Sequence, residues 1–230
     1  MFDIFSKKST ITLDCFTFIP DLPDLFPIVR ASQNLPSWWK SLDPTVQHQG
    51  INKGTMKTCP GVTDYFKSGF IIPMWKDMIF EMNSGVLRAY PDDDAAPHHP
   101  AQWGKGLENY SHMKLITPWR IKEKTGVNFM FTNTFWHNNT STYTVPNGVV
   151  NYKYQTTASV NMVVNKNVFP NKFEIKAGDP LAHVIPMSDK QLKIKLHLVT
   201  VEEYAKLDFY QFTFAGNYYK RKKILQDKGK

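Results

Sequence analysis

The densest group of side chains that could take part in chemistry lies between residues 88 and 114. Carboxylates and imidazoles gather there, and both are common ligands of metal ions. The candidates are Asp92, Asp93, Asp94, His98, His99 and His112. Three prolines interrupt the stretch and two adjacent histidines cannot easily share one ion. The sequence therefore favours a solvated, loop-rich surface segment over a metal site.

Residue sets for nucleophilic or acid–base catalysis do not stand out elsewhere. No Ser-His-Asp, Cys-His or paired-carboxylate arrangement occurs with a useful spacing. His137 and His183 lie near expected strands and are interpreted as core or interface histidines. Cys15 and Cys59 are the only cysteines, and we expect two buried thiols rather than a disulfide. These observations favour a protein that is not an enzyme and that uses no cofactor.

The net charge of +8 and the isoelectric point near 9.3 would suit a polyanionic partner. The densest positive charge, however, lies near the end of the chain, at Lys220, Arg221, Lys222 and Lys223. A solvated helix end is the simpler interpretation of this run. A contact with nucleic acid or with an acidic partner is the alternative.

Length and composition indicate an ordered globular protein. The chain has 230 residues, of which 42% are hydrophobic and 14% aromatic. No apolar run approaches the roughly 18 residues of a membrane span, and the first residues lack a signal-peptide pattern. We therefore expect a soluble protein of the cytoplasm with no membrane partner.

Residue alternation and turn chemistry predict a mainly β protein. The run from 192 to 199 places leucine and isoleucine on one face and lysine and histidine on the other. The run from 70 to 80 is apolar on both faces and should be covered on both sides. The runs 114–122 and 127–135 should form a hairpin. The expected strands cover residues 11–18, 70–80, 114–122, 127–135, 149–154, 159–164, 181–186 and 192–199.

Short helices are expected between the strands. Pro36 favours a helix start, and a second helix is expected over 63–68. Thr200 and Glu203 have the spacing of a capping box, which marks the start of another helix. The last part of the chain should be helical, with an interruption at Gly216.

These elements predict one β-sandwich or β-clip-like domain over residues 37–200. A strand and a proline-rich extended arm, residues 1–36, would precede it, and a basic helical tail, residues 201–230, would follow. The tandem tryptophans Trp38 and Trp39 have two interpretations, since they could anchor a helix to the core or form part of an interface.

The segment from 145 to 187 resembles the β-clip of trimeric dUTP pyrophosphatases. GVVNYKY at 148–154 is similar to their G-V-I-D-x-D-Y motif, and FEIKAGDPLAHVI at 173–185 is similar to their F-x-I-x-x-G-D-x-I-A-Q-L-I motif. The residues marked by this resemblance are Gly148, Asn151, Tyr154, Gly178 and Asp179. It implies a β-clip and a threefold assembly. Asn151 stands in place of the aspartate of those enzymes, which implies that dUTP is not hydrolysed.

A second resemblance covers most of the chain from 36 to 187. The strings CPGVTDYFKSGFIIPMWKDM, LITPWRIKEKTG and IKAGDPLAHVIPM are similar to those of an uncharacterised family of tailed phages, especially phages of marine bacteria and cyanobacteria. This resemblance implies a viral protein found in the host cytoplasm or incorporated in the virion.

Two functions from different classes follow from these observations. The first is a non-enzymatic phage structural or accessory protein that acts through protein–protein contacts. Its partners would be other copies of itself, as a homo-oligomer and most simply a trimer, or other phage proteins. The interface candidates are Trp38, Trp39, Tyr218 and Tyr219. The alternative is a dUTP pyrophosphatase-like protein that binds or hydrolyses nucleotides with an altered active site.

Overall fold

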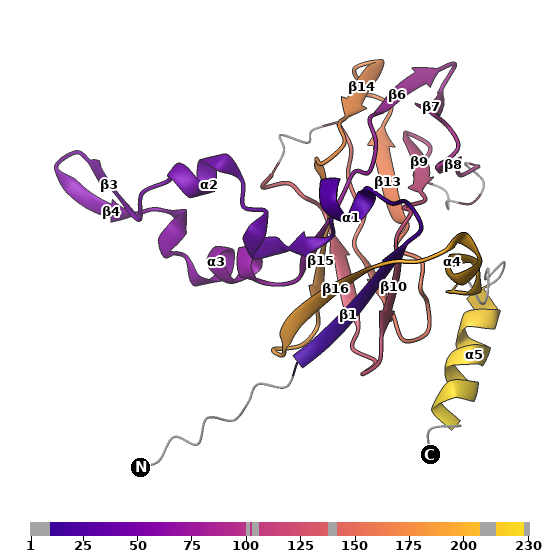
Figure 1. Cartoon of the computed structure of the whole chain (residues 1–230). Helices are drawn as coiled ribbons and strands as arrows, with labels where there is room; N and C mark the ends of the chain where they lie inside the picture. Colours follow the sequence, from indigo (N-terminus) through magenta and orange to yellow (C-terminus); the bar gives the residue numbers. More distant parts are fainter. Residues whose placement is uncertain (1–9, 100–101, 103–105, 138–141, 208–214, 228–230) are drawn as a thin grey trace, which may run out of the picture.

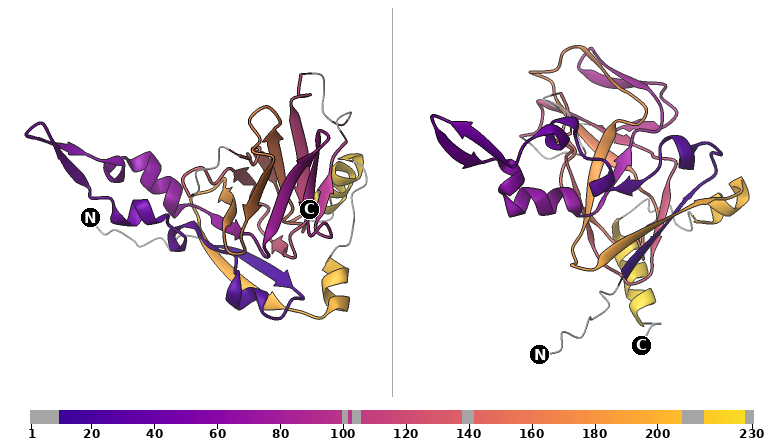
Figure 2. Two further views of the ribbon diagram at one scale, coloured as in Figure 1. Left: turned by 90° about the horizontal axis from the view of Figure 1, so that it is seen from above. Right: turned by 60° about the vertical axis from the view of Figure 1, so that its left-hand side comes forward.

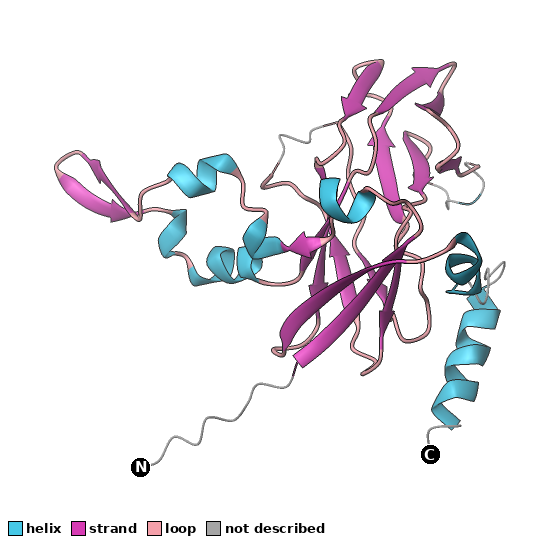
Figure 3. Ribbon diagram, in the orientation of Figure 1, coloured by secondary structure: helices cyan, strands magenta, loops and turns pink. Residues whose placement is uncertain are grey.

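The computed structural model describes residues 10–99, 102, 106–137, 142–207 and 215–227, and the chain is mainly β (Figure 1). Strand accounts for 41% and helix for 20% of the structure, which confirms the predicted class. The strands form several small sheets that are mostly antiparallel. Figure 3 shows most of the helices in a lobe that projects from the body and near the C-terminus, with one short helix on the body itself.

The first sheet has the order β10-β1-β16 and so pairs the first strand of the chain with the last. The N-terminal strand β1 runs parallel to β16 and antiparallel to β10. Its alternate residues Ile11, Leu13 and Cys15 are fully buried, as the period of two predicts for a half-buried strand. The three strands are β1 (Thr10–Thr17), β10 (Arg120–Glu123) and β16 (Gln191–Leu198).

The second sheet has five antiparallel strands in the order β12-β11-β15-β5-β2. Residues 70–74 in and after β5 are all buried, which confirms that this segment is covered on both sides. The strands are β2 (Val29–Arg30), β5 (Phe70–Pro73), β11 (Phe129–Thr132), β12 (Gly148–Val150) and β15 (Pro180–Pro186).

Two three-stranded antiparallel sheets complete the body. One has the order β13-β9-β8, with β8 (Ala95–Pro97), β9 (Tyr110–Leu115) and β13 (Val160–Asn165). The other has the order β14-β6-β7, with β6 (Met78–Asn83), β7 (Val86–Tyr90) and β14 (Lys172–Ile175). One cluster of buried apolar side chains draws on all four of these sheets. Among its largest members are Trp119, Tyr152, Phe70, Phe80 and Phe129.

Residues 31–68 form a lobe that projects away from this body in every view (Figures 1 and 2). We call it the projecting lobe. The chain leaves the body after β2 and returns at β5. The lobe consists of the 3-10 turn η1 (Ala31–Gln33), α2 (Ser37–Ser41), the hairpin β3–β4 (Thr45–His48 and Ile51–Gly54), the 3-10 turn η2 (Met56–Thr58) and α3 (Pro60–Lys67).

The remaining helices are α1 (Leu22–Leu25), α4 (Val201–Leu207) and α5 (Ala215–Asp227). The predicted capping box opens α4, since the Thr200 N–H donates to the Glu203 carboxylate and the Glu203 N–H donates to the Thr200 hydroxyl. Gly216 lies inside α5 and does not interrupt it.

Several predicted boundaries are wrong for physical reasons. The run 70–80 divides at residues 74–77 into β5 and β6, which belong to different sheets. The hairpin of 114–122 with 127–135 does not form, because β10 pairs with β1 and β11 pairs with β12 and β15. The strand predicted over 149–154 ends at Val150, where a turn begins.

Four further expectations need correction. The stretch from 88 to 114 contains part of β7, all of β8 and most of β9 and is not simply a loop. The proline-rich arm is not simply an extended surface segment, because it forms α1 and buries Leu22 and Ile28. Cys59 is exposed at the start of α3, although Cys15 is buried as expected. That helix begins at Pro60 rather than near Thr63, since proline fits its first turn.

Candidate functional site

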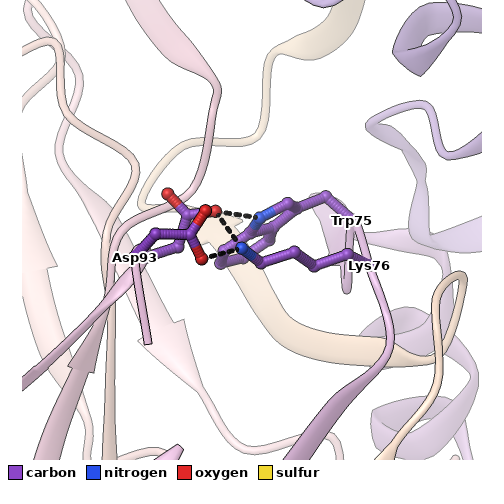
Figure 4. Close-up of polar contacts among 4 residues, drawn as sticks. Trp75, Lys76 and Asp93 are labelled. Atoms are coloured by element: carbon purple, nitrogen blue, oxygen red, sulfur yellow. Dashed lines mark hydrogen bonds and ion pairs between the residues drawn. The ribbon is translucent and has the colours of Figure 1, made fainter. Parts of the chain in front are cut away.

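Two of the three aspartates that were considered as metal ligands are instead paired with a lysine (Figure 4). The Nζ atom of Lys76 lies 2.5 Å from a carboxylate oxygen of Asp93 and 2.7 Å from one of Asp94. The indole N–H of Trp75 donates to the same oxygen of Asp94 over 3.0 Å. Trp75 and Lys76 occupy the break between β5 and β6. These carboxylates therefore attach the loop 92–94 to that break.

The pKa values of the paired groups move in the directions that stabilise the ion pairs. Burial alone would lower the pKa of Lys76, but its hydrogen bonds to Asp93 and Asp94 raise it above its ordinary value. The hydrogen bond from Lys76 lowers the pKa of Asp93. Both groups are therefore charged at neutral pH, and the pairing is structural.

Two of the three candidate histidines meet where His98, just after β8, lies beside His112 of β9. The rings of His98 and His112 lie 4.2 Å apart, and Nε2 of His112 lies 3.1 Å from Oδ1 of Asn161. Burial, together with the charge of His98, lowers the pKa of His112 to about 4. His99 lies on an exposed position beside them. Over the described ranges, no group of three or more His, Cys, Asp or Glu side chains has the arrangement of a metal site.

The asparagine at the dUTP pyrophosphatase-like position is a structural residue. Asn151 is buried, and its amide donates to the carbonyl of Gly126 over 2.8 Å and to Oδ1 of Asn128 over 2.9 Å. Its own Oδ1 accepts from the backbone N–H of Lys153. Because three hydrogen bonds use this side chain, it closes the turn that follows β12.

The other marked residues of that segment have separate neighbours. Gly148 begins β12 and pairs with Phe131, while Tyr154 is buried in the turn after Asn151. The backbone of Gly178 and Asp179 hydrogen-bonds with Met74, and the Asp179 carboxylate accepts from the N–H of Lys176. These contacts fix the turn that precedes β15.

The tandem tryptophans lie where the projecting lobe meets the body. Trp39 is 7% exposed and Trp38 is 36% exposed. Both pack on Phe66 of α3, with ring centroids 4.6 Å away for Trp39 and 6.2 Å away for Trp38. The indole of Trp38 also donates to the carbonyl of Trp136. The pair therefore anchors the lobe, as the first of the two interpretations predicts.

Histidines complete this junction. His183 is fully buried, 4.5 Å from the ring of Tyr65, and its Nε2 lies 2.7 Å from the carbonyl of Ser68. Nε2 of His137 lies 2.6 Å from the carbonyl of Asn34. The Tyr65 hydroxyl donates to the carbonyl of Asn133. Both histidines are thus core or interface residues, as expected.

The hairpin β3–β4 at the tip of the projecting lobe is exposed at every residue. Its register places Val46, His48, Ile51 and Lys53 on one face and only polar or small residues on the other. Val46 is 52% exposed and Ile51 is 62% exposed. One face of the hairpin therefore combines two exposed aliphatic side chains with a histidine and a lysine, and this face is open within the single chain.

The C-terminal candidates lie on α5. Tyr218 and Arg221 are within this helix, and the side chain of Tyr219 is 67% exposed. Lys220 and Lys223 are exposed. The aromatic residues between 209 and 214 lie outside the described residues. Among the helices that the structure describes, none combines the length and apolar character needed to cross a membrane.

One cleft contains residues that the sequence analysis did not single out. It lies beside the sheet β10-β1-β16 and is lined by Asp14, Phe16, Lys122, Glu123, Lys124, Tyr152, Lys153, Tyr154, Thr156, His197 and Leu207. The signal that could have revealed it is the alternating polar face of β16, from which His197 lines the cleft. No protein-family model matches this sequence, and comparison with curated proteins finds no match.

Proposed function

We propose that this chain is a non-enzymatic phage structural or accessory protein that acts through protein–protein contacts, and that the projecting lobe makes the contact. The observation that carries the proposal is the hairpin β3–β4, which extends from the body and leaves Val46 and Ile51 exposed on one face. The phage origin rests on the sequence resemblance alone.

The shape of the lobe supports a contact function. An isolated two-stranded hairpin is marginally stable in water, so a partner that covers one face would stabilise it. A rigid base is also needed for a contact to be specific. The packing of Trp38, Trp39 and Phe66 supplies such a base.

The partner that we propose is a second copy of the chain, in a trimer. The β-clip resemblance implies threefold symmetry, and we retain a β-clip or sandwich arrangement of the sheets as part of the proposal. In a closed ring, the hairpin of one copy would lie on the body of the next. Other phage proteins would then bind the assembled ring.

The enzymatic alternative receives less support. A dUTP pyrophosphatase needs a carboxylate to activate water. The residue at that position, Asn151, uses its side chain in three structural hydrogen bonds. We therefore favour contacts over catalysis.

Light scattering across micromolar concentrations tests the proposal. The wild-type mass should rise to that of a trimer, and Val46→Asp with Ile51→Asp should return it to a monomer. The matched control is Gln47→Asp with Asn52→Asp, which adds the same charge to the opposite face of the hairpin. The control should behave as the wild type.

A wild-type mass that stays monomeric at every concentration would overturn self-association. Equal loss of association in both double variants would also overturn it, because general repulsion would then explain the result. Mass spectrometry of purified particles checks whether the protein belongs to the virion.

A further inference from the structure

The cleft beside the sheet β10-β1-β16 has a volume of about 530 Å³, which is within the range of ligand sites. Strands β1 and β16, which cross the front of the body in Figure 1, form one side. The turn 152–156 and the end of α4 form the other. The hydroxyl of Thr156 donates to the carbonyl of Leu207 over 3.0 Å and so connects these two parts.

The aromatic surface in the cleft consists of two rings stacked face to face. Phe16 of β1 pairs with His197 of β16, and their rings stack with centroids 4.7 Å apart and planes 19° from parallel. Nε2 of His197 lies 2.9 Å from a carboxylate oxygen of Asp14, which orients the imidazole. Nζ of Lys122 lies 6.0 Å from the centroid of the Phe16 ring. A planar ligand ring could extend this stack on the outer face of His197, or on that of Phe16 if the Lys122 side chain moves aside.

Positive charge surrounds the aromatic surface. The outward positions of β16 carry Lys193 and Lys195, which pair with Thr12 and Asp14 of β1. Lys222 of α5 places its Nζ 5.9 Å from the ring of Tyr154, which lines the cleft. The lysines of this basic face are Lys122, Lys124, Lys153, Lys193, Lys195 and Lys222.

The carboxylates in the cleft are already bonded to neighbouring groups. Asp14 pairs with His197, as described above. Glu123 is 3% exposed, and its carboxylate accepts hydrogen bonds from the backbone N–H groups of Thr125, Gly126 and Val127. The face therefore presents a net positive charge to a ligand.

We propose that this cleft binds single-stranded nucleic acid, with one base on the Phe16–His197 stack and the phosphates on the surrounding lysines. Aromatic platforms within a positively charged groove are the common means of binding unpaired strands. A duplex would hide the faces of its bases, which the stack requires.

Charge placement favours a polymer over a free nucleotide. Lys193 and Lys195 do not line the cleft but extend the basic face along β16. Alternate residues of a strand lie about 6.6 Å apart, so these lysines can contact successive phosphates of an extended chain. An acidic peptide would use the lysines but would gain nothing from the aromatic stack.

Fluorescence anisotropy with a labelled oligothymidylate of roughly 20 nucleotides, longer than a typical binding site, tests the proposal. The full-length protein should bind it at low salt, with a logarithmic salt slope of about −2 to −4, as expected for three to five phosphate contacts. A duplex of equal length, thymidine monophosphate and polyglutamate serve as competitors. All three should compete at least tenfold more weakly than the unlabelled oligonucleotide.

Two variants separate stacking from charge. Phe16→Leu keeps an apolar side chain but removes the flat ring, and it should weaken binding about tenfold. Lys122→Gln with Lys153→Gln should weaken binding and reduce the salt slope by about 1 to 2. The charge-matched control is Lys40→Gln with Lys67→Gln, on the projecting lobe, which should bind as the wild type does.

Four outcomes would overturn the proposal. They are absence of binding at low salt, equal competition by any of the three competitors, equal weakening in the lysine control, and unchanged binding by a folded Phe16→Leu variant. Circular dichroism reports whether that variant folds. If Phe16→Leu does not fold, the variant Lys122→Gln with Lys153→Gln still tests the proposal. Both lysines are exposed, so their substitution should leave the fold intact. The oligomeric state, which tests the projecting lobe, is measured separately.

Discussion

The indole nitrogen of Trp38 donates a hydrogen bond to the main-chain carbonyl of Trp136 across 2.7 Å. These residues belong to different parts of the molecule, the projecting lobe and a loop of the body after β11. The bond therefore connects the lobe to the body directly, in addition to the packing of the rings 6.1 Å apart.

Substitutions at Trp38 should separate these two contributions. Trp38→Phe removes the hydrogen bond and should lower the free energy of unfolding by about 1 kcal/mol. Trp38→Ala also removes the packing and should cost about 2–3 kcal/mol, since the side chain is partly exposed. Urea denaturation measures both. Leu25→Ala, at a side chain that is 64% exposed, is the control and should change stability by less than about 0.5 kcal/mol.

Gly69, where the lobe returns to the body, should not tolerate a side chain. Its φ is +76°, and a Cβ atom would collide with the backbone carbonyl of Val184. Gly69→Ala should therefore cost at least about 3 kcal/mol. Gly61→Ala, inside α3 with open space around it, should instead stabilise by about 0.5–1 kcal/mol. Equal effects at both glycines, measured by thermal unfolding, would contradict this prediction.

Asn151→Asp should destabilise the protein without creating an enzyme. The new carboxylate would face the carbonyl of Gly126 and Oδ1 of Asn128, both acceptors, and the cost should be about 3 kcal/mol. Asn167→Asp, at an exposed turn, provides a matched control with little effect. Neither the wild type nor either variant should release pyrophosphate from dUTP with magnesium. Release by the wild type would show that the non-enzymatic assignment is wrong.

His183 should make stability depend on pH. Burial lowers its pKa to about 4, whereas an unfolded histidine titrates near 6.5. Between these values the unfolded chain binds the proton and the folded chain does not, so stability falls as pH falls from about 6.5 to 4. The loss should be on the order of 2–3 kcal/mol. Stability should level off above pH 7.

The measurement compares urea denaturation at pH 4.5 and 7.5. His183→Gln should show a smaller difference between the two conditions than the wild type. His112, whose pKa is also lowered to about 4, contributes a part that this variant retains. An identical pH dependence in the variant and the wild type would contradict the role of His183.

Local sequence patterns predicted the strands in which the order of apolar and polar residues follows from which side chains are buried. Alternation located β1, β13 and β16 within one or two residues, because each has one face on the core. The apolar run 181–186 located β15, which is buried on both faces. The same patterns missed the break between β5 and β6. That break is stabilised by the pairing of Lys76 with Asp93 and Asp94, which no local pattern reveals.

The candidate sites divide in the same way. Because tryptophan is enriched at protein interfaces, Trp38 and Trp39 were candidates from the sequence. The structure shows that they anchor the lobe. The basic cleft was missed because it draws Phe16, Lys122, Lys153 and His197 from four distant parts of the chain. The exposed hairpin β3–β4 was missed because Val46 and Ile51 are the only large apolar residues in its sequence.

The parallel pairing of β1 with β16 has a consequence for synthesis of the protein. Residue 10 pairs with residue 191, and the other neighbour of β1, β10, begins at residue 120. During translation the first strand must therefore wait with both edges unpaired until β10 has left the ribosome, and with one edge unpaired until β16 follows. Such distant pairing makes folding slow and leaves an apolar strand available to other nascent chains. Truncation before β16 should accordingly yield an insoluble product.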